Sequence, residues 1–282
     1  MIKVIKSGVY SSIQDFGRIG FAKFGVPLSG VMDSYSASLS NRLLNNNPEE
    51  AVLEITFGGC QLQFEKRTQI SLTGADFSPT INGNHIAMNS IVDVAKDSVL
   101  TFGKRVFGVR TYIAILGGIQ SEEILKSKSF YKGISIKLRL KTGDVIPYRN
   151  TNLSGQIKFS KIKIDTNHFS SSTMSCSKGP EFNLLSKEQQ KKLTTQLFTI
   201  SNDNNRVGYR LEESLENNLE SILTSGVLPG TVQLTPSGKL IVLMRDCQVT
   251  GGYPRVLQLS ETAMNRLGQK TAGDTLKFWM NE

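Results

Sequence analysis

Three stretches of the chain combine glycine or proline with arginine, acids and amides, the residue types that can hold and activate a small polar molecule. They are residues 13–33, 204–212 and 245–255. Glycine lets the backbone approach a ligand closely. Arginine stays charged and offers a planar fork of donors that suits a carboxylate or a phosphate. We therefore expect the segments around Arg18, Arg206–Arg210 and Gly251–Gly252 to line one cleft.

The charged side chains of these stretches are the candidate catalytic groups. Arginine can offset negative charge that develops on a carbonyl oxygen, and aspartate can act as a base or orient an arginine. For each arginine, Arg255 included, a structural ion pair is an equally good interpretation. Asp33 has the same chemistry, but its favoured role is as a helix cap. The predicted catalytic residues are Asp15, Arg18, Arg206, Arg210 and Asp246.

Amides, hydroxyls and a glycine turn supply the candidate substrate contacts. The turn at residues 250–254 can present backbone N–H groups to an oxyanion or a phosphate, with a plain tight turn as the alternative. Gln14 and Gln248 can bond the edge of an amide or ureido substrate, or equally satisfy loop backbone. The predicted substrate-binding residues are Gln14, Pro27, Ser29, Gln248, Thr250, Gly251, Gly252 and Tyr253.

Several familiar kinds of active site are missing from the sequence. It has no G-x-x-x-x-G-K-[ST] phosphate loop, no G-x-S-x-G elbow and no G-x-G-x-x-G after a strand. The two histidines do not look poised as bases, the three cysteines lack zinc-site spacing, and Cys247 is best interpreted as a passive small residue. We predict no metal site, and we do not expect a self-sufficient hydrolase or kinase of a standard type.

Composition indicates an ordinary globular protein. Hydrophobic residues make up 39% and charged residues 20% of the chain. No apolar run approaches the roughly 18 residues of a membrane span, and residues 1–6 alternate like a strand rather than a signal peptide, so we expect a cytoplasmic location. The net charge of +9 is spread along the chain. Without a recognition helix or zinc finger it favours a basic surface or an anionic small substrate over nucleic acid.

Short segments rich in β-branched and aromatic residues, bounded by turns, predict strands. Examples are residues 70–73, 111–116, 239–244 and 275–279. Helix starts are indicated at Asp33 or Ser34, at Ser186 with Gln189 as a capping box opening 187–198, and at Ser260, with Gly268 ending the last helix. The fold class is therefore mostly β with a few helices.

A change to polar composition divides the chain. We predict β-rich modules at residues 1–150 and 175–282, joined by a polar linker or loop at 151–174. A polar loop inside a single domain is the alternative.

Runs of residues that occur in order from about residue 8 to residue 278 resemble one known family. They include 8–18, 25–33, 206–211, 227–233 and 250–255. Together they resemble the biotin-dependent carboxyltransferase / allophanate hydrolase subunit 2 family. The resemblance implies cyclophilin-like β-barrel modules, in agreement with the predicted strands.

Within that family, stand-alone chains of this size resemble the C subunit of 5-oxoprolinase. The resemblance implies an enzyme subunit that is inactive alone and works with a homologous B subunit and a third subunit, using ATP to open 5-oxoproline to glutamate. Larger relatives imply an alternative, carboxyl transfer between biotin and a urea-like acceptor. Three departures from the family pattern keep a non-catalytic partner-binding regulator as a third possibility: residues 125–130 lack the usual arginine, residues 174–178 replace an expected apolar strand, and Cys247 replaces a frequent arginine.

Overall fold

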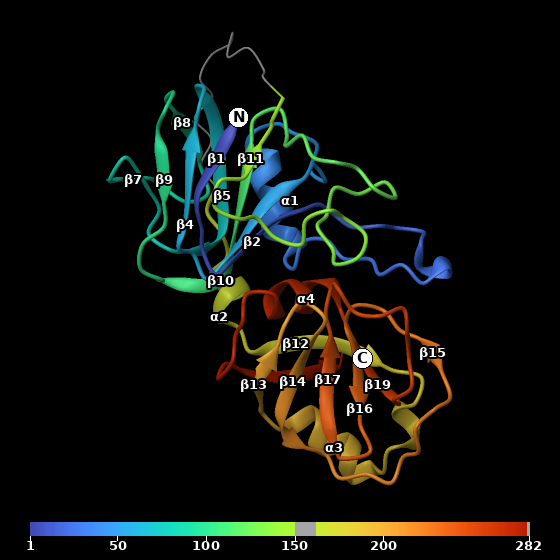
Figure 1. The fold of residues 1–282 in the computed structure, drawn as a ribbon. Coiled ribbons are helices and arrows are strands. Elements are labelled where there is room, and N and C mark those ends of the chain that lie inside the picture. The colour runs from blue at the N-terminus through green and yellow to red at the C-terminus, as the bar shows by residue number, and fades with distance from the viewer. Residues whose placement is uncertain (150–161, 281–282) are drawn as a thin grey trace. The chain divides into compact units, whose positions relative to one another are not determined.

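The computed structural model describes residues 1–149 and 162–280. Strands dominate and a few short helices accompany them (Figure 1). The second half contains a closed β-barrel. The predicted fold class, mostly β with a few helices in cyclophilin-like barrel modules, is confirmed. Within the described part of the chain, no helix is both long enough and apolar enough to cross a membrane.

The chain forms two compact units. The first consists of Met1–Gly17 and Asp33–Thr166, and the second of Arg18–Met32 and Asn167–Glu282. Residues 18–32 thus pack with the second unit, although they lie early in the sequence. Residues 151–161 of the predicted polar segment at 151–174 fall outside the described residues.

Two antiparallel sheets build the first unit, and they enclose a core that includes Val4, Leu53, Leu62 and Ile113. The six-stranded sheet has the order β11 (Val145–Ile146), β1 (Ile2–Ser7), β4 (Cys60–Phe64), β9 (Val99–Thr101), β6 (Thr80–Ile81) and β7 (Asn84–His85). The five-stranded sheet has the order β2 (Tyr10–Gln14), β3 (Val52–Thr56), β10 (Phe107–Ile115), β5 (Thr68–Asp76) and β8 (Ile91–Val94).

Helix α1 (Ser34–Leu43) packs on β5 and β10 in the first unit. Asp33 caps it, since its Oδ1 accepts the Ser36 N–H at 3.1 Å, which is the role favoured from the sequence. The Asp33 N–H donates to Tyr112 Oη at 2.8 Å, and Tyr112 Oη donates to Glu54 Oε2 at 2.9 Å. Burial and the negative charge of Glu54 raise the pKa of Tyr112 well above its usual value, so the phenol stays protonated and donates.

Seven strands close into a barrel in the second unit. Their order is β12 (Thr173–Lys178), β19 (Arg255–Leu259), β16 (Thr231–Leu234), β17 (Lys239–Leu243), β14 (Gly208–Ser214), β13 (Phe198–Asn204) and β20 (Thr275–Met280). Strands β12 and β20 pair in parallel, with Ser175 opposite Trp279, and this pairing closes the ring. A small ladder outside the barrel joins β15 (Ser225–Gly226) to β18 (Thr250–Gly251).

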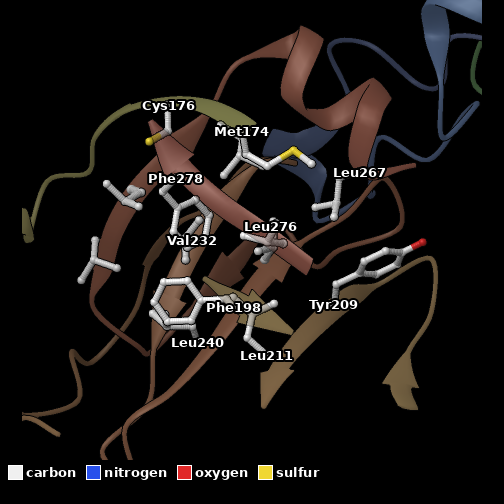
Figure 2. Packing of buried hydrophobic residues seen from close by; sticks show 14 of the residues in the cluster. Met174, Cys176, Phe198, Tyr209, Leu211, Val232, Leu240, Leu267, Leu276 and Phe278 are labelled. Carbon is white, nitrogen blue, oxygen red and sulfur yellow. The ribbon is translucent and has the colours of Figure 1, made fainter. Parts of the chain in front are cut away.

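Alternating apolar side chains from these strands fill the barrel (Figure 2). The rings of Phe198 and Phe278 lie 5.5 Å apart at a tilt of 49°. Both side chains are fully buried, as are Val232 and Leu276. Burial of each such side chain stabilises the fold by about 1.5–3 kcal/mol, so the second unit has its own core.

Short helices accompany the barrel: η1 (Ala22–Phe24), α2 (Asn167–Ser170), η2 (Phe182–Leu184), α3 (Lys187–Thr195) and α4 (Glu261–Leu267). In Figure 1, α3 and α4 lie at opposite ends of the barrel. The predicted capping box of Ser186 and Gln189 is present, and Ser260 caps α4. The helix predicted to reach residue 198 ends at Thr195, because Phe198 enters β13 and is buried in the barrel.

Gly268 follows α4 as predicted, but it does not use a left-handed conformation. Its φ is −58°, and a Cβ there would lie 2.7 Å from the carbonyl oxygen of Met32. Close backbone contact therefore requires glycine at this position. Met32 ends the early segment that packs with the second unit.

Candidate functional site

A cavity of about 220 Å³ opens in the second unit among residues of the second and third predicted stretches. Three predicted site residues, Arg210, Gln248 and Tyr253, line it. The complete lining is Asn205, Val207, Gly208, Arg210, Gln233, Ile241, Leu243, Gln248 and Tyr253. We call this cavity the barrel pocket.

The turn that leads into β14 shapes one wall of the barrel pocket. Asn205 Oδ1 accepts the N–H groups of Val207 at 2.7 Å and Gly208 at 3.3 Å, which fixes the turn. A larger residue at position 208 would be crowded, because a Cβ there would lie 3.2 Å from Ile241 Cγ2. The chain then enters β14 and brings Arg210 to the pocket two residues later.

Arg210 is the cation of the barrel pocket. Its Nη1 donates to Asp203 Oδ2, and the side chains of the pair are 47% and 65% exposed. A solvated pair of this kind contributes little to stability, about 0–1 kcal/mol. A guanidinium has five N–H donors, so Arg210 can bind a carboxylate while it stays beside Asp203.

Gln233 is a pocket residue absent from the predicted set. It lies in β16, is only 2% exposed, and its Nε2 donates to the Tyr253 carbonyl at 3.5 Å. A Cβ on Gly251 would lie 2.5 Å from Gln233 Nε2, so glycine at 251 leaves room for the amide. The signal in the sequence was an amide within the apolar strand Thr231–Leu234, where a buried polar group needs a partner.

The lining of the barrel pocket suits binding more than proton transfer. Asn205, Gln233 and Gln248 carry primary amides, each with donors and an acceptor, and Arg210 adds positive charge. No Asp, Glu, His, Lys or Cys occurs among the lining residues. The pocket can therefore orient an amide-like, anionic molecule, and Tyr253 is the lining residue whose O–H could take part in proton transfer.

Arg206 and Asp246 bind each other instead of lining the barrel pocket. Arg206 Nε and Nη2 donate to Asp246 Oδ2 and Oδ1, both at 2.9 Å, and Nη2 also donates to the Gly30 carbonyl at 2.6 Å. Ser29 Oγ donates to Asp246 Oδ1 at 2.8 Å. These contacts join the early segment 18–32 to the barrel within the second unit, which is a structural role.

The remaining predicted residues of the early segment lie away from the lining. Arg18 is 1% exposed, and its backbone N–H donates to the Leu28 carbonyl at 2.8 Å. Pro27 is half-buried. Neither residue lines the barrel pocket. Of the three segments expected in one cleft, the structure places parts of the second and third at the pocket and leaves Arg18 out of its lining.

Arg255, considered as an anion contact, is occupied by a carboxylate. Its Nε and Nη2 donate to Glu181 Oε2 at 2.9 Å and Oε1 at 2.7 Å, and Nη1 donates to the Gly226 carbonyl at 2.9 Å. The hydrogen bond from Arg255 lowers the pKa of Glu181, and the same bond raises the pKa of Arg255. The structural ion pair is therefore the interpretation that fits Arg255.

The glycine turn is tied to the ladder beside the barrel. Thr250 and Gly251 pair with Gly226 and Ser225, and the Gly252 carbonyl accepts the Ile222 N–H at 2.9 Å. The turn thus holds its backbone in place while Tyr253 lines the pocket.

Gln14 and Asp15 belong to the first unit and organise a loop there. Asp15 Oδ1 accepts the hydroxyls of Ser127 and Ser129, both at 2.6 Å, and Oδ2 accepts the Lys128 N–H at 2.6 Å. Gln14 Nε2 donates to Ser12 Oγ at 3.0 Å and to the carbonyl of Phe130 at 3.3 Å. With the Gly17 N–H as a further donor, the Asp15 carboxylate has little capacity left to act as a base.

Cys247 is buried in the second unit, with 3% exposure. Burial, and then the negative charge of Asp246, raise the pKa of its thiol to about 12. A thiol with that pKa is a poor nucleophile at neutral pH. Across residues 1–149 and 162–280, no three His, Cys, Asp or Glu side chains gather as a metal site would need.

Comparison with known proteins identifies the family. The family model described as "Carboxyltransferase domain, subdomain A and B" matches residues 24–280. The C subunit of the Escherichia coli K12 5-oxoprolinase is 30% identical over 99% of this chain and 90% of its own length. The Haemophilus influenzae protein of the same name is 26% identical over 99% of this chain and 90% of its own length. The urea amidolyase of Saccharomyces cerevisiae is 36% identical over 51% of this chain and 8% of its own length.

Solved structures agree with this assignment. The crystal structure of TTHA0988 has a TM-score of 0.87 and 25% identity, covering 99% of this chain and 55% of that chain. The Kluyveromyces lactis urea amidolyase has a TM-score of 0.86 and 28% identity, covering 98% of this chain and 18% of that chain. This chain thus spans about half of the TTHA0988 chain. It belongs to the family of the carboxyltransferase domain, subdomains A and B.

Proposed function

We propose that this chain is the C subunit of an ATP-dependent 5-oxoprolinase. It acts with a homologous B subunit to bind and activate 5-oxoproline for ring opening to glutamate. The similarity to two 5-oxoprolinase C subunits over 90% of their length supports this proposal. The observation that carries it is the chemistry of the barrel pocket.

The barrel pocket matches the functional groups of 5-oxoproline. The ring amide offers one N–H and one carbonyl, and the primary amides of Asn205, Gln233 and Gln248 can pair with both. The ring also carries a carboxylate, for which Arg210 is the fitting partner. The cavity of about 220 Å³ is smaller than the roughly 300–1,000 Å³ of pockets for drug-sized ligands. It suits a single small ring.

ATP enters the proposal through the partner subunits. The sequence has no phosphate loop, which supports this part of the proposal. In the alternative reaction, biotin would be carried by a separate chain.

The part of this chain in the reaction is to hold and orient the substrate. Gln233 is buried and is fixed between Gly251 and the Tyr253 carbonyl, so its amide is positioned before the substrate binds. A preorganised amide costs little ordering free energy on binding. Since the lining holds no Asp, Glu, His, Lys or Cys, we infer that a partner subunit supplies the proton transfer and that the chain is inactive alone.

Reconstitution from purified subunits tests the proposal. The chain, the homologous B subunit and the third subunit are mixed with 5-oxoproline and ATP, and glutamate release is measured. We expect glutamate only when ATP and all three subunits are present. A complete mixture that releases no glutamate, or a mixture that does so equally well without this chain, would count against the proposal.

Carboxyl transfer between biotin and a urea-like acceptor is the second candidate. The 36% identity to urea amidolyase over half of the chain favours it. Urea presents the same kind of amide edge as 5-oxoproline. Transfer of carboxyl groups from a biotinylated carrier to urea, in a mixture that releases no glutamate from 5-oxoproline, would select this reaction.

A non-catalytic partner-binding regulator is the third candidate. An Arg210→Ala variant separates it from an enzyme subunit when partner affinity and turnover are both measured. Turnover lost with complex formation retained indicates a role in the reaction. The cytoplasmic location stays a prediction from the sequence.

A further inference from the structure

The first unit contains a second cavity, of about 440 Å³, that the proposed function does not use. Ile13, Phe130, Leu140 and Ile146 line it, and each of these residues is at most 6% exposed because it belongs to the core. The cavity therefore has an apolar floor. Its volume is sufficient for a large apolar side chain, and we call it the first-unit cavity.

Exposed apolar side chains accompany this cavity. Ile136 and Val145 line it, yet they are 85% and 45% exposed. Leu138, two residues after Ile136, is 43% exposed. Apolar side chains gathered at an apolar cavity and left in contact with water are typical of a surface that a partner covers.

The rim of the cavity is held in place by its own hydrogen bonds. Ser135 Oγ accepts the Tyr131 N–H at 2.7 Å and donates to the Lys137 carbonyl at 2.6 Å. Lys137 Nζ donates to Asp144 Oδ1 at 2.6 Å. A rim fixed in this way loses little conformational freedom when a partner binds, which favours affinity.

The segment that borders the cavity carries net positive charge, although Glu122 and Lys137 both line the cavity itself. Residues 121–144 contain six Lys or Arg against Glu122, Glu123 and Asp144, an excess of +3 within a chain of net charge +9. Lys132, Arg139 and Lys141 are exposed. A surface of one sign steers and selects a partner of the opposite sign.

We propose that the first-unit cavity is the docking site for a protein partner, into which an acidic segment of that partner inserts a large apolar side chain. The partner is the homologous subunit of the complex, an identity that rests on the proposed function. A small ligand fits these observations less well. Such sites enclose the ligand, whereas Ile136 and Val145 at this cavity are 85% and 45% exposed.

The test measures the affinity of the full chain for the purified homologous subunit. Ile136→Asp places a charge at the cavity without disturbing the core, because residue 136 is 85% exposed. Leu184→Asp is the matched control, since Leu184 is 64% exposed in the second unit. A third variant, Lys132→Glu with Arg139→Glu, reverses part of the charge. Circular dichroism confirms that each variant is folded.

We expect Ile136→Asp to weaken the complex at least tenfold and Leu184→Asp to change its Kd less than twofold. The charge-reversal variant should also weaken the complex. Raising the salt concentration should weaken binding of this variant less than it weakens binding of the wild type, because fewer charge pairs are screened. An unchanged Kd for Ile136→Asp would overturn the docking proposal, even if the mixture releases glutamate. A complex that depends on Ile136 but releases no glutamate would support docking and count against the reaction. Failure of the wild-type chain to bind the homologous subunit would overturn both.

Discussion

Arg206 donates two hydrogen bonds to Asp246, from Nε to Oδ2 and from Nη2 to Oδ1, each at 2.9 Å. Both were predicted to be catalytic. The carboxylate also accepts the Ser29 hydroxyl, and the guanidinium also reaches the Gly30 carbonyl. Two residues expected at the chemistry therefore join residues 18–32 to the barrel, and measurement can separate this structural role from the predicted catalytic one.

Asp246→Ala should destabilise the second unit. The substitution leaves the Arg206 side chain, which is 10% exposed, without its carboxylate, and such a loss typically costs about 3–5 kcal/mol. Asp246→Asn keeps the shape and should cost less. Urea denaturation measures both. A stability change below about 1 kcal/mol together with lost turnover would instead indicate a chemical role for Asp246.

Gly251→Ala should impair substrate binding. The added Cβ would lie 2.5 Å from Gln233 Nε2, so the amide has to leave its position in the barrel pocket. In the reconstituted enzyme we expect KM for 5-oxoproline to rise about tenfold, a change of about 1.4 kcal/mol in binding free energy. Gly226→Ala is the control, because Gly226 lies in the same small ladder with open space around its Cβ position. Equal KM values for Gly251→Ala and Gly226→Ala would show that Gln233 does not contribute to substrate binding.

The pair of Glu181 and Arg255 should make stability depend on acid pH. Hydrogen bonding to Arg255 lowers the pKa of Glu181 in the folded protein below its unfolded value. The folded state then binds fewer protons, so the contribution is present above the unfolded pKa of about 4.3 and is lost as pH falls through the folded pKa. Glu181→Gln should flatten the fall in stability below about pH 4.5. Parallel acid unfolding curves for the wild type and the variant would contradict this.

The three cysteines should resist alkylation in the folded protein. Burial raises the pKa of Cys60 and Cys176 to about 11 and, together with Asp246, that of Cys247 to about 12. Iodoacetamide at about pH 8 should leave the native chain unlabelled and should label it after denaturation, as mass spectrometry can show. Rapid labelling of native Cys247 would identify it as a reactive thiol.

Local chemistry explains how much of the structure the sequence could predict. Helix starts at Asp33, Ser186 and Ser260 were found because a cap depends on a few adjacent residues. The β-rich class followed from short β-branched runs between turns. These features need no knowledge of distant contacts.

The partners of the site residues could not be predicted, because they are far away in the sequence. Arg255 and Glu181 are 74 positions apart, so no pattern could tell an ion pair from an anion site. Gln233 reaches the pocket only because β16 lies beside the turn that carries Gly251. The packing of residues 18–32 with the second unit depends on Ser29 and Asp246, which are 217 positions apart.

The central claim, that the barrel pocket receives the carboxylate of 5-oxoproline through Arg210, is tested most directly by kcat/KM of the reconstituted enzyme carrying Arg210→Ala. The control is Arg67→Ala, since Arg67 is also an exposed arginine beside an aspartate, Asp93, but lies in the first unit. We predict that Arg210→Ala lowers kcat/KM for 5-oxoproline at least tenfold, mainly through KM, while Arg67→Ala leaves it within twofold and both variants assemble normally. Equal kcat/KM values for Arg210→Ala and the wild type would contradict the claim.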